Sequence, residues 1–165
     1  VIIHQLRREQ IVHASMEACW AFFSNPHNLR ELTPAWMDFT VTSDTPARMY
    51  PGMIISYRIR PLLGIPQTWV TEITHVDEGR YFVDEQRFGP YRMWHHQHHF
   101  KSLGDGRVRM TDIVDYVMPL GPVGNLVHRL YIAKQLREVF DYRIRAVDTL
   151  FPAPEAMAGH EAAAR

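Results

Sequence analysis

The most unusual segment of the chain is Trp94–Phe100, WHHQHHF, which contains four of the ten histidines. His96 and His98 lie two residues apart, so on a β-strand both side chains project to the same side. Imidazole titrates near neutral pH, and it serves in proteins as a general acid or base and as a metal ligand. The segment therefore predicts two histidines that can act together on one face of a sheet.

Turn signals on either side of this segment predict its neighbours. With turns at residues 89–91 and 104–106, His96 lies opposite Asp84 and His98 opposite Asp112. These groups could bind Zn or Fe, or they could form a buried network in which Asp84 pairs with His96 and Asp112 with His98. A metal needs three converging ligands, and this register guarantees two. The network is the preferred interpretation, and no metal or other cofactor is predicted.

The strands that position these groups follow from period-two patterns between turn signals. Short connections between them favour antiparallel pairing. Two short helices are expected after the first strand, one capped by Ser15 and one capped by Asn28. The sequence thus predicts an α+β fold with a curved antiparallel sheet of about seven strands. The strands are expected at residues 3–12, 38–42, 53–60, 68–76, 81–87, 93–101 and 108–118.

A long helix is expected at residues 123–151. Apolar residues recur along it at steps of three and four, which is the pattern of a helix with one buried face. We expect this face to pack on the sheet along its whole length, with Asp141, Arg143, Arg145 and Asp148 lying largely off it. The apolar stripe consists of Leu126, Leu130, Ala133, Leu136, Phe140, Ile144, Val147 and Phe151.

One face of the predicted sheet combines large aromatic side chains with a few polar groups. A face that only packs on a helix is rich in Val, Ile and Leu, whereas this mixture is typical of a ligand cavity. The alternative is an aromatic core whose polar groups are all satisfied. The candidate ligand-binding residues are Tyr57, Trp69, Ile73, Phe82, Asp84, Trp94, His96, His98, Phe100, Asp112 and Tyr116 on the sheet, with Leu136, Phe140 and Ile144 on the helix.

Composition limits the partners and surroundings of the protein. The 165 residues include 18 basic and 18 acidic side chains, and this balance argues against a nucleic-acid or membrane-surface partner. The single cysteine, Cys19, forms no intrachain disulfide and is compatible with a reducing cytoplasm. No apolar run reaches the roughly 20 residues that span a bilayer. We expect a cytoplasmic monomer or weak homodimer, with one domain at residues 1–151 and a disordered tail at residues 152–165.

Several short motifs, in this order of elements, carry a resemblance to a known family. They are ACWAFFSNP at 18–26, NL at 28–29, LTP at 32–34, WVTEI at 69–73, FVDEQ at 82–86, GPY at 89–91 and DIVDY at 112–116, together with Trp94, His96, His98, Phe100 and Pro119. The chain resembles the START-like superfamily, also called SRPBCC, over about residues 3–151. It looks most like bacterial ligand-binding members similar to polyketide cyclase/dehydrase and lipid-transport proteins.

The resemblance implies a helix-grip fold, in which the curved sheet wraps around the long C-terminal helix. Proteins of this kind bind lipids, sterols, polyketides or plant-hormone-like molecules, and some of them cyclise or dehydrate the bound molecule. The first hypothesis is therefore a protein that binds a small hydrophobic or aromatic metabolite or lipid in a cavity between sheet and helix.

The second hypothesis is a cyclase or dehydratase that acts on a polyketide-like substrate. In that case His96 or His98 moves a proton and Tyr116 polarises a carbonyl group. A metal-dependent β-barrel of the cupin type would also use closely spaced histidines, but the long amphipathic helix argues against it.

Overall fold

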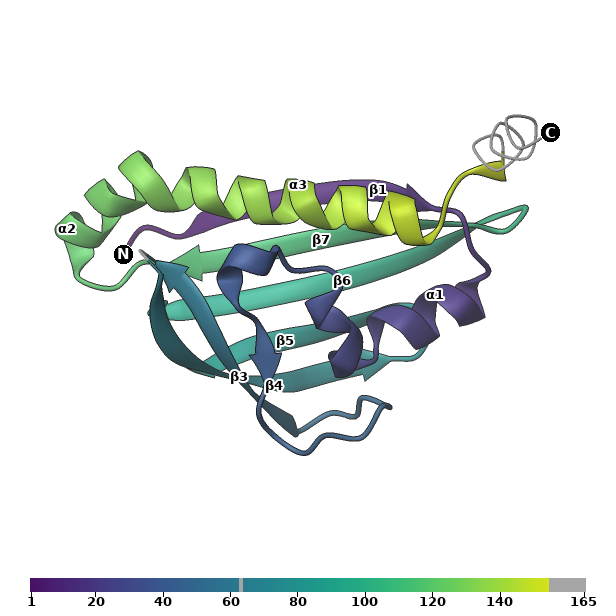
Figure 1. Ribbon diagram of the computed structural model, residues 1–165, viewed down its shortest axis with the longest axis horizontal. Helices are drawn as coiled ribbons and strands as arrows, with labels where there is room; N and C mark the ends of the chain where they lie inside the picture. Colours follow the sequence, from purple (N-terminus) through teal and green to yellow (C-terminus); the bar gives the residue numbers. More distant parts are fainter. Residues whose placement is uncertain (63, 155–165) are drawn as a thin grey trace.

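The computed structural model describes residues 1–62 and 64–154 of the chain. Seven strands form one antiparallel sheet in the order β1-β7-β6-β5-β4-β3-β2, and a long C-terminal helix runs across it (Figure 1). This confirms the predicted helix-grip fold class. The predicted disordered tail lies outside the described residues from position 155 onward. The strands are β1 (His4–Val12), β2 (Thr40–Val41), β3 (Met53–Leu62), β4 (Ile65–Asp77), β5 (Tyr81–Phe88), β6 (Met93–Gly104) and β7 (Arg107–Val117).

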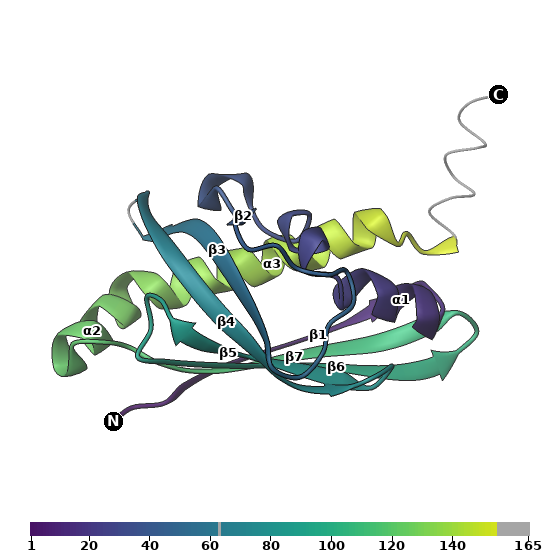
Figure 2. The ribbon, with the colours of Figure 1, turned by 90° about the horizontal axis from the view of Figure 1, so that it is seen from below.

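The short helices lie on the same side of the sheet as the long helix (Figures 1 and 2). Helix α1 (Met16–Phe23) begins at the predicted cap, because Ser15 Oγ accepts a hydrogen bond from the backbone N–H of Ala18 at 3.2 Å.

The next helical segment differs from the prediction. It consists of two 3₁₀ turns, η1 (Pro26–Arg30) and η2 (Ala35–Met37), and η1 is capped by Asn25. Asn28, the predicted cap, instead donates its side-chain amide to the carbonyl of Phe22 at 2.9 Å. Pro26 explains the earlier start, since its fixed φ suits the first position of a helix.

The C-terminal helix is continuous, but its hydrogen-bonding pattern changes from α-helical to π-helical and back along its length. It consists of α2 (Gly121–Val127), a π-helical turn η3 (His128–Ile132) and α3 (Ala133–Leu150). The prediction that its apolar face packs on the sheet throughout is wrong at the start, where Leu126 is 50% and Leu130 is 71% exposed. Only the later part of the helix buries a continuous face.

The buried face of α3 also differs from the predicted stripe. Its buried side chains are Leu136, Phe140, Arg143 and Val147, at steps of four, three and four. Arg143 was expected off the stripe, whereas Ile144, expected on it, is only partly buried. The helix therefore brings a guanidinium group into the protein interior, which has consequences for the site described below.

The strand register agrees with the register predicted from the turns. His96 is paired with Asp84 across β5 and β6, and His98 is paired with Asp112 across β6 and β7. Along β6 the side chains at even-numbered positions 94–100 are buried and those at odd-numbered positions are half-buried. This alternation turns His96 and His98 toward the helices and His95 and His99 toward the other face.

The hydrophobic core consists of two clusters that meet at the middle of the sheet. One contains Phe100 and packs under α1, and the other contains Trp94 and packs under the first part of α3. His96 and His98 lie between these two residues on β6, so the boundary between the clusters is polar. In the described part of the chain, no helix combines the length and apolar composition needed to cross a membrane.

Candidate functional site

A cavity of about 140 Å³ lies between the sheet and helix α3 and is partly open to solvent. This volume is comparable to that of a protein void that binds benzene. Most of the wall is apolar or aromatic, which is typical of sites for small organic molecules. Trp36, one of the wall residues, is 47% exposed and so marks the rim of the cavity.

Most of the predicted site residues belong to this wall. The sheet contributes aromatic rings and the ionisable groups, and α3 contributes apolar side chains from the opposite side. The predicted residues that line the cavity are Tyr57, Trp69, Ile73, Phe82, Asp84, Trp94, His96, His98, Leu136 and Phe140.

Four predicted site residues do not line the cavity. Phe100 packs edge-on against Trp20 in the core under α1. Tyr116 is hydrogen-bonded through its hydroxyl to His128 Nε2 at 2.8 Å, beneath the π-helical turn. Ile144 is only partly buried and is not among the wall residues. The fourth residue, Asp112, is buried behind the two histidines.

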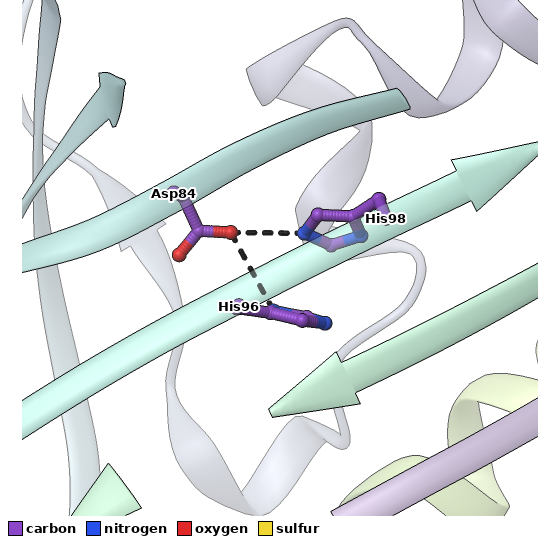
Figure 3. Close-up of side chains that lie close together, drawn as sticks. All are labelled: Asp84, His96 and His98. Carbon is purple, nitrogen blue, oxygen red and sulfur yellow. Dashed lines mark hydrogen bonds and ion pairs between the residues drawn. The ribbon is translucent and has the colours of Figure 1, made fainter. Parts of the chain in front are cut away.

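The two histidines and two aspartates form one network rather than the two separate pairs that were predicted. Hydrogen bonds join His98 Nε2 to Asp84 Oδ1 at 2.9 Å and His96 Nε2 to Asp112 Oδ1 at 3.1 Å. In addition, His98 Nδ1 lies 3.0 Å from Asp112 Oδ1, and His96 Nδ1 lies 3.5 Å from Asp84 Oδ1. Each carboxylate therefore contacts both rings, and the Asp84 carboxylate faces both of them (Figure 3).

The two imidazoles experience opposite shifts. Burial alone would lower the pKa of His98, but its hydrogen bonds to Asp112 and Asp84 outweigh burial and raise it. Burial, together with the charge of His98, lowers the pKa of His96 in spite of the same two carboxylates. These directions favour the protonated ring, with both nitrogens donating, at His98 and the neutral ring at His96.

The carboxylates stay ionised although they are buried. Burial opposes this, but the charge of Arg143 and the hydrogen bonds from His96 and His98 hold the pKa of Asp112 well below its usual range. His96 and His98 likewise lower the pKa of Asp84 against the effect of burial. The two aspartates then balance the two cations, Arg143 and His98, and the network as a whole is neutral.

Arg143 closes the network from the helix side. Its Nε lies 3.5 Å from Asp112 Oδ2, and its guanidinium carbon lies 5.7 Å from the centre of the Phe23 ring, within the range of a cation–π contact. Its Nη2 also approaches His98 Nδ1 at 3.4 Å. Because a protonated His98 has no lone pair there, this last approach is a contact and not a hydrogen bond.

Comparison with known families identifies the chain. The sequence profile of the family described as "Polyketide cyclase / dehydrase and lipid transport" matches residues 12–146. The chain belongs to this family. The resemblance noted from the short motifs is thereby confirmed, while no sequence among the curated proteins matches significantly.

Solved structures show the same fold at low sequence identity. The Zhui aromatase/cyclase from a Streptomyces species has a TM-score of 0.69 and 12% identity, over 88% of this chain and 92% of that one. The ginseng major latex-like protein 151 from Panax ginseng has a TM-score of 0.68 and 13% identity, over 93% and 100%. Protein Ms6760 from Mycobacterium smegmatis has a TM-score of 0.62 and 19% identity, over 88% and 89%.

In this member of the polyketide cyclase / dehydrase family, sequence reasoning missed two groups of wall residues. Arg143 was missed because only apolar residues were used to define the buried stripe, although its spacing of three from Phe140 and four from Val147 signals the same face. The second group comes mostly from the segment between α1 and β3, which lacks strand or helix periodicity, and begins with two residues at the end of α1. It includes Phe22, Phe23, Leu29, Leu32, Trp36, Met37, Phe39 and Met49.

The raised pKa of His98 predicts a loss of stability in alkaline solution. The ion pairs of protonated His98 stabilise the fold fully below its ordinary pKa of 6.5, and this contribution is lost as pH rises through the higher pKa of the folded state. The free energy of unfolding, measured with urea in a chelating buffer between about pH 6 and pH 9, should therefore decrease with pH.

The variant His98→Gln is expected to remove most of this alkaline decrease. His95→Gln is the matched control, because His95 lies on the same strand but contacts Glu85 on the other face at 2.8 Å. Equal slopes of unfolding free energy against pH in the wild type and His98→Gln would show that His98 is not charged in the folded protein.

Proposed function

We propose that the protein binds a small hydrophobic or aromatic metabolite that carries a polar oxygen-containing group. The observation that carries this proposal is the aromatic-walled cavity with ionisable side chains in one wall. A lipid-like molecule with one aromatic or cyclic portion belongs to the same class. The family and its fold support this function, and they leave the identity of the ligand open.

The aromatic walls favour a flat, largely apolar ligand. Trp69 and Trp94 contact each other edge to face, with ring centres 5.1 Å apart, and both belong to the wall. Rings at such angles present both faces and edges to a bound ring, and aromatic pairs gain stability from edge-to-face contacts beyond the area that they bury.

The polar groups of the wall favour an oxygen atom on the ligand. The indole N–H of Trp69 is buried and has no hydrogen-bond partner among the described residues. A buried donor without a partner costs about 1–3 kcal/mol. The side chain of Asp84, 17% exposed, is accessible to a hydroxyl group of a ligand, whereas the Trp69 ring would have to shift to bring its N–H to a ligand oxygen.

Native mass spectrometry of the freshly purified protein tests the binding function. We expect a species heavier than the chain by one small organic molecule, and we expect acid denaturation to release that molecule for identification. A chain mass without any adduct, combined with no binding of an aromatic fluorescent probe, would contradict the proposal.

A cyclase or dehydratase is the second candidate function. It is favoured by the position of His96 in the cavity wall with Asp84 and Asp112 on either side, since an imidazole held by carboxylates is a common arrangement for proton transfer. The solved aromatase/cyclase with the same fold supports this candidate as an analogy. Tyr116, proposed from sequence to polarise a carbonyl, does not line the cavity and is left out of this role.

The bound molecule itself distinguishes the two candidates. If the protein only binds its ligand, wild type and His96→Gln should copurify with the same compound. If it is a dehydrating enzyme, His96→Gln should copurify with a compound heavier by one water. The control His95→Gln should behave as the wild type in both cases, and a change in that variant would contradict a role for the cavity histidine.

A further inference from the structure

Three potential metal-ligand atoms converge at one point of the cavity wall. Asp84 Oδ1 lies 2.9 Å from His98 Nε2 and 3.5 Å from His96 Nδ1, and one ligand atom from each residue lies within 4.8 Å of the others (Figure 3). Around a tetrahedral ion with ligands at about 2.0–2.1 Å, neighbouring ligand atoms are about 3.3 Å apart. The two distances from Asp84 fall on either side of this value, and the two histidine nitrogens lie within 4.8 Å of each other, so side-chain adjustment would admit an ion.

Asp112 contacts the other nitrogen of each imidazole ring, the one that does not face Asp84. Its Oδ1 is 3.1 Å from His96 Nε2 and 3.0 Å from His98 Nδ1. When both of these nitrogens donate to Asp112, the lone pairs are left on His96 Nδ1 and His98 Nε2, which are the nitrogens that face Asp84. A carboxylate that accepts the second N–H of a metal-ligating histidine is the usual way in which such a ring is oriented.

Arg143 forms an ion pair with Asp112 from the helix side, without a hydrogen bond from its Nε. Its Nε lies 3.5 Å from Asp112 Oδ2, whereas the distances to the two histidines are those of Oδ1. Both residues are buried. The arrangement therefore has an inner set of three ligands, a carboxylate that orients two of them and a cation that holds this carboxylate.

The inner set requires a positive charge at its centre. A carboxylate oxygen and two imidazole lone pairs repel one another in a buried site unless a cation lies between them. A divalent ion at the centre of the set would contact all three atoms.

We propose that Asp84, His96 and His98 bind one divalent first-row transition-metal ion such as Zn²⁺. Two imidazoles and one carboxylate form a ligand set of catalytic zinc and non-haem iron sites, whereas Mg²⁺ and Ca²⁺ prefer oxygen ligands. The sequence alone favours a network without metal because its register guarantees two ligands, and the structure supplies the third.

The site would leave coordination positions open toward the cavity, because all three ligands belong to the cavity wall. An oxygen atom of a bound organic molecule could then reach the ion. This last step rests on the proposed function, while metal binding itself does not. The experiment uses only the metal ion, so failure to bind the ion would not contradict the proposed binding of an organic ligand. Absence of a bound organic ligand would likewise not contradict metal binding.

Titration of the full-length chain, purified without a histidine tag and stripped with a chelator, tests the proposal. We expect one equivalent of Zn²⁺ to bind with a dissociation constant below about 1 μM. Mg²⁺ should not compete at millimolar concentration. Co²⁺ should give visible absorption without a thiolate band, because Cys19 is the only cysteine and is buried on α1.

Variants assign the ion to this site. Asp112→Asn alters the carboxylate that orients the two histidines, and it should weaken Zn²⁺ binding by about 10–100-fold. Asp84→Asn and His96→Gln alter ligands themselves, and they should weaken Zn²⁺ binding by more. His95→Gln and His99→Gln are the matched controls, since these half-buried histidines lie on the same strand but on the other face. Their affinities should equal that of the wild type.

Measurements on the wild type keep the test decisive if a ligand variant fails to fold. X-ray absorption at the zinc edge should show two imidazoles and oxygen ligands at about 2.0–2.1 Å. Binding weaker than about 100 μM, a single imidazole at the zinc edge, or loss of affinity in the His95→Gln or His99→Gln control would each overturn the proposal.

Discussion

Replacing Arg143 by methionine is expected to lower the free energy of unfolding by about 3–5 kcal/mol near neutral pH. Methionine keeps most of the length of the side chain but removes the cation that faces Asp112. The network then holds two buried carboxylates against one cation, His98. An uncompensated buried charge costs far more than a lost surface ion pair, so this single change removes a large part of the stability of an ordinary domain.

A double variant separates the charge effect from the loss of packing. Arg143→Met combined with Asp112→Asn removes one charge of each sign and should recover a substantial part of the lost stability. Arg145→Met is the matched control, because Arg145 lies on the same helix but is exposed, and its replacement should change stability by no more than about 0.5 kcal/mol.

Urea unfolding followed by circular dichroism measures all of these variants. If Arg143→Met costs less than about 1 kcal/mol, Asp112 is not held as a buried anion and the assignment of charges in the network is wrong. If Arg143→Met does not fold at all, the double variant still answers the question, since its recovery depends on the same unpaired charge.

The register of the central strands could be predicted from the sequence because two local signals agree. Turns at residues 89–91 and 104–106 fix which residues face each other, and the alternation of aromatic and polar residues fixes which side is buried. Together they place His96 opposite Asp84 and His98 opposite Asp112, as the structure does. The choice of hydrogen-bond partners could not be predicted, because it depends on side-chain rotamers.

The sequence was less informative about the helices. The step of three or four residues identifies a helical stripe, but it does not reveal how far the helix extends past the sheet, and so Leu126 and Leu130 were expected to be buried although they are exposed. When the buried face of a helix is predicted from its apolar residues alone, a buried charged residue such as Arg143 is left out. Arg143 becomes intelligible only once Asp112 is known to lie beneath it, which is tertiary information.

The other half of the cavity wall was missed for a different reason. Residues 24–49 contain short 3₁₀ turns, the two-residue strand β2 and connecting segments, which have no periodic pattern that would assign individual side chains to the interior. The segment is nevertheless rich in aromatic residues and methionine. Such side chains in a long connection between a helix and a sheet indicate that it covers an apolar surface, without showing which ones touch a ligand.

The substitution Leu136→Trp is expected to weaken binding in the cavity roughly 100-fold. Leu136 lies on α3, is buried beside Trp94 and Phe140, and lines the cavity, so an indole at this position extends into the space for the ligand. A ligand that loses the burial of one aromatic ring loses about 3 kcal/mol, which corresponds to a roughly 100-fold weaker affinity. Overpacking should cost about 1–3 kcal/mol of stability, and circular dichroism would establish that the variant is folded.

Leu130→Trp provides the matched control for this cavity-filling change. It makes the same substitution on the same C-terminal helix, but Leu130 is 71% exposed and lies outside the cavity wall. Binding of a small, uncharged aromatic fluorescent probe should therefore be weakened by this factor in Leu136→Trp and retained in Leu130→Trp. Loss of probe binding in Leu130→Trp but not in Leu136→Trp would place the probe on the exposed apolar start of the helix. A molecule held between the sheet and α3 has no contact with that surface, so this result would show that the cavity has no part in binding.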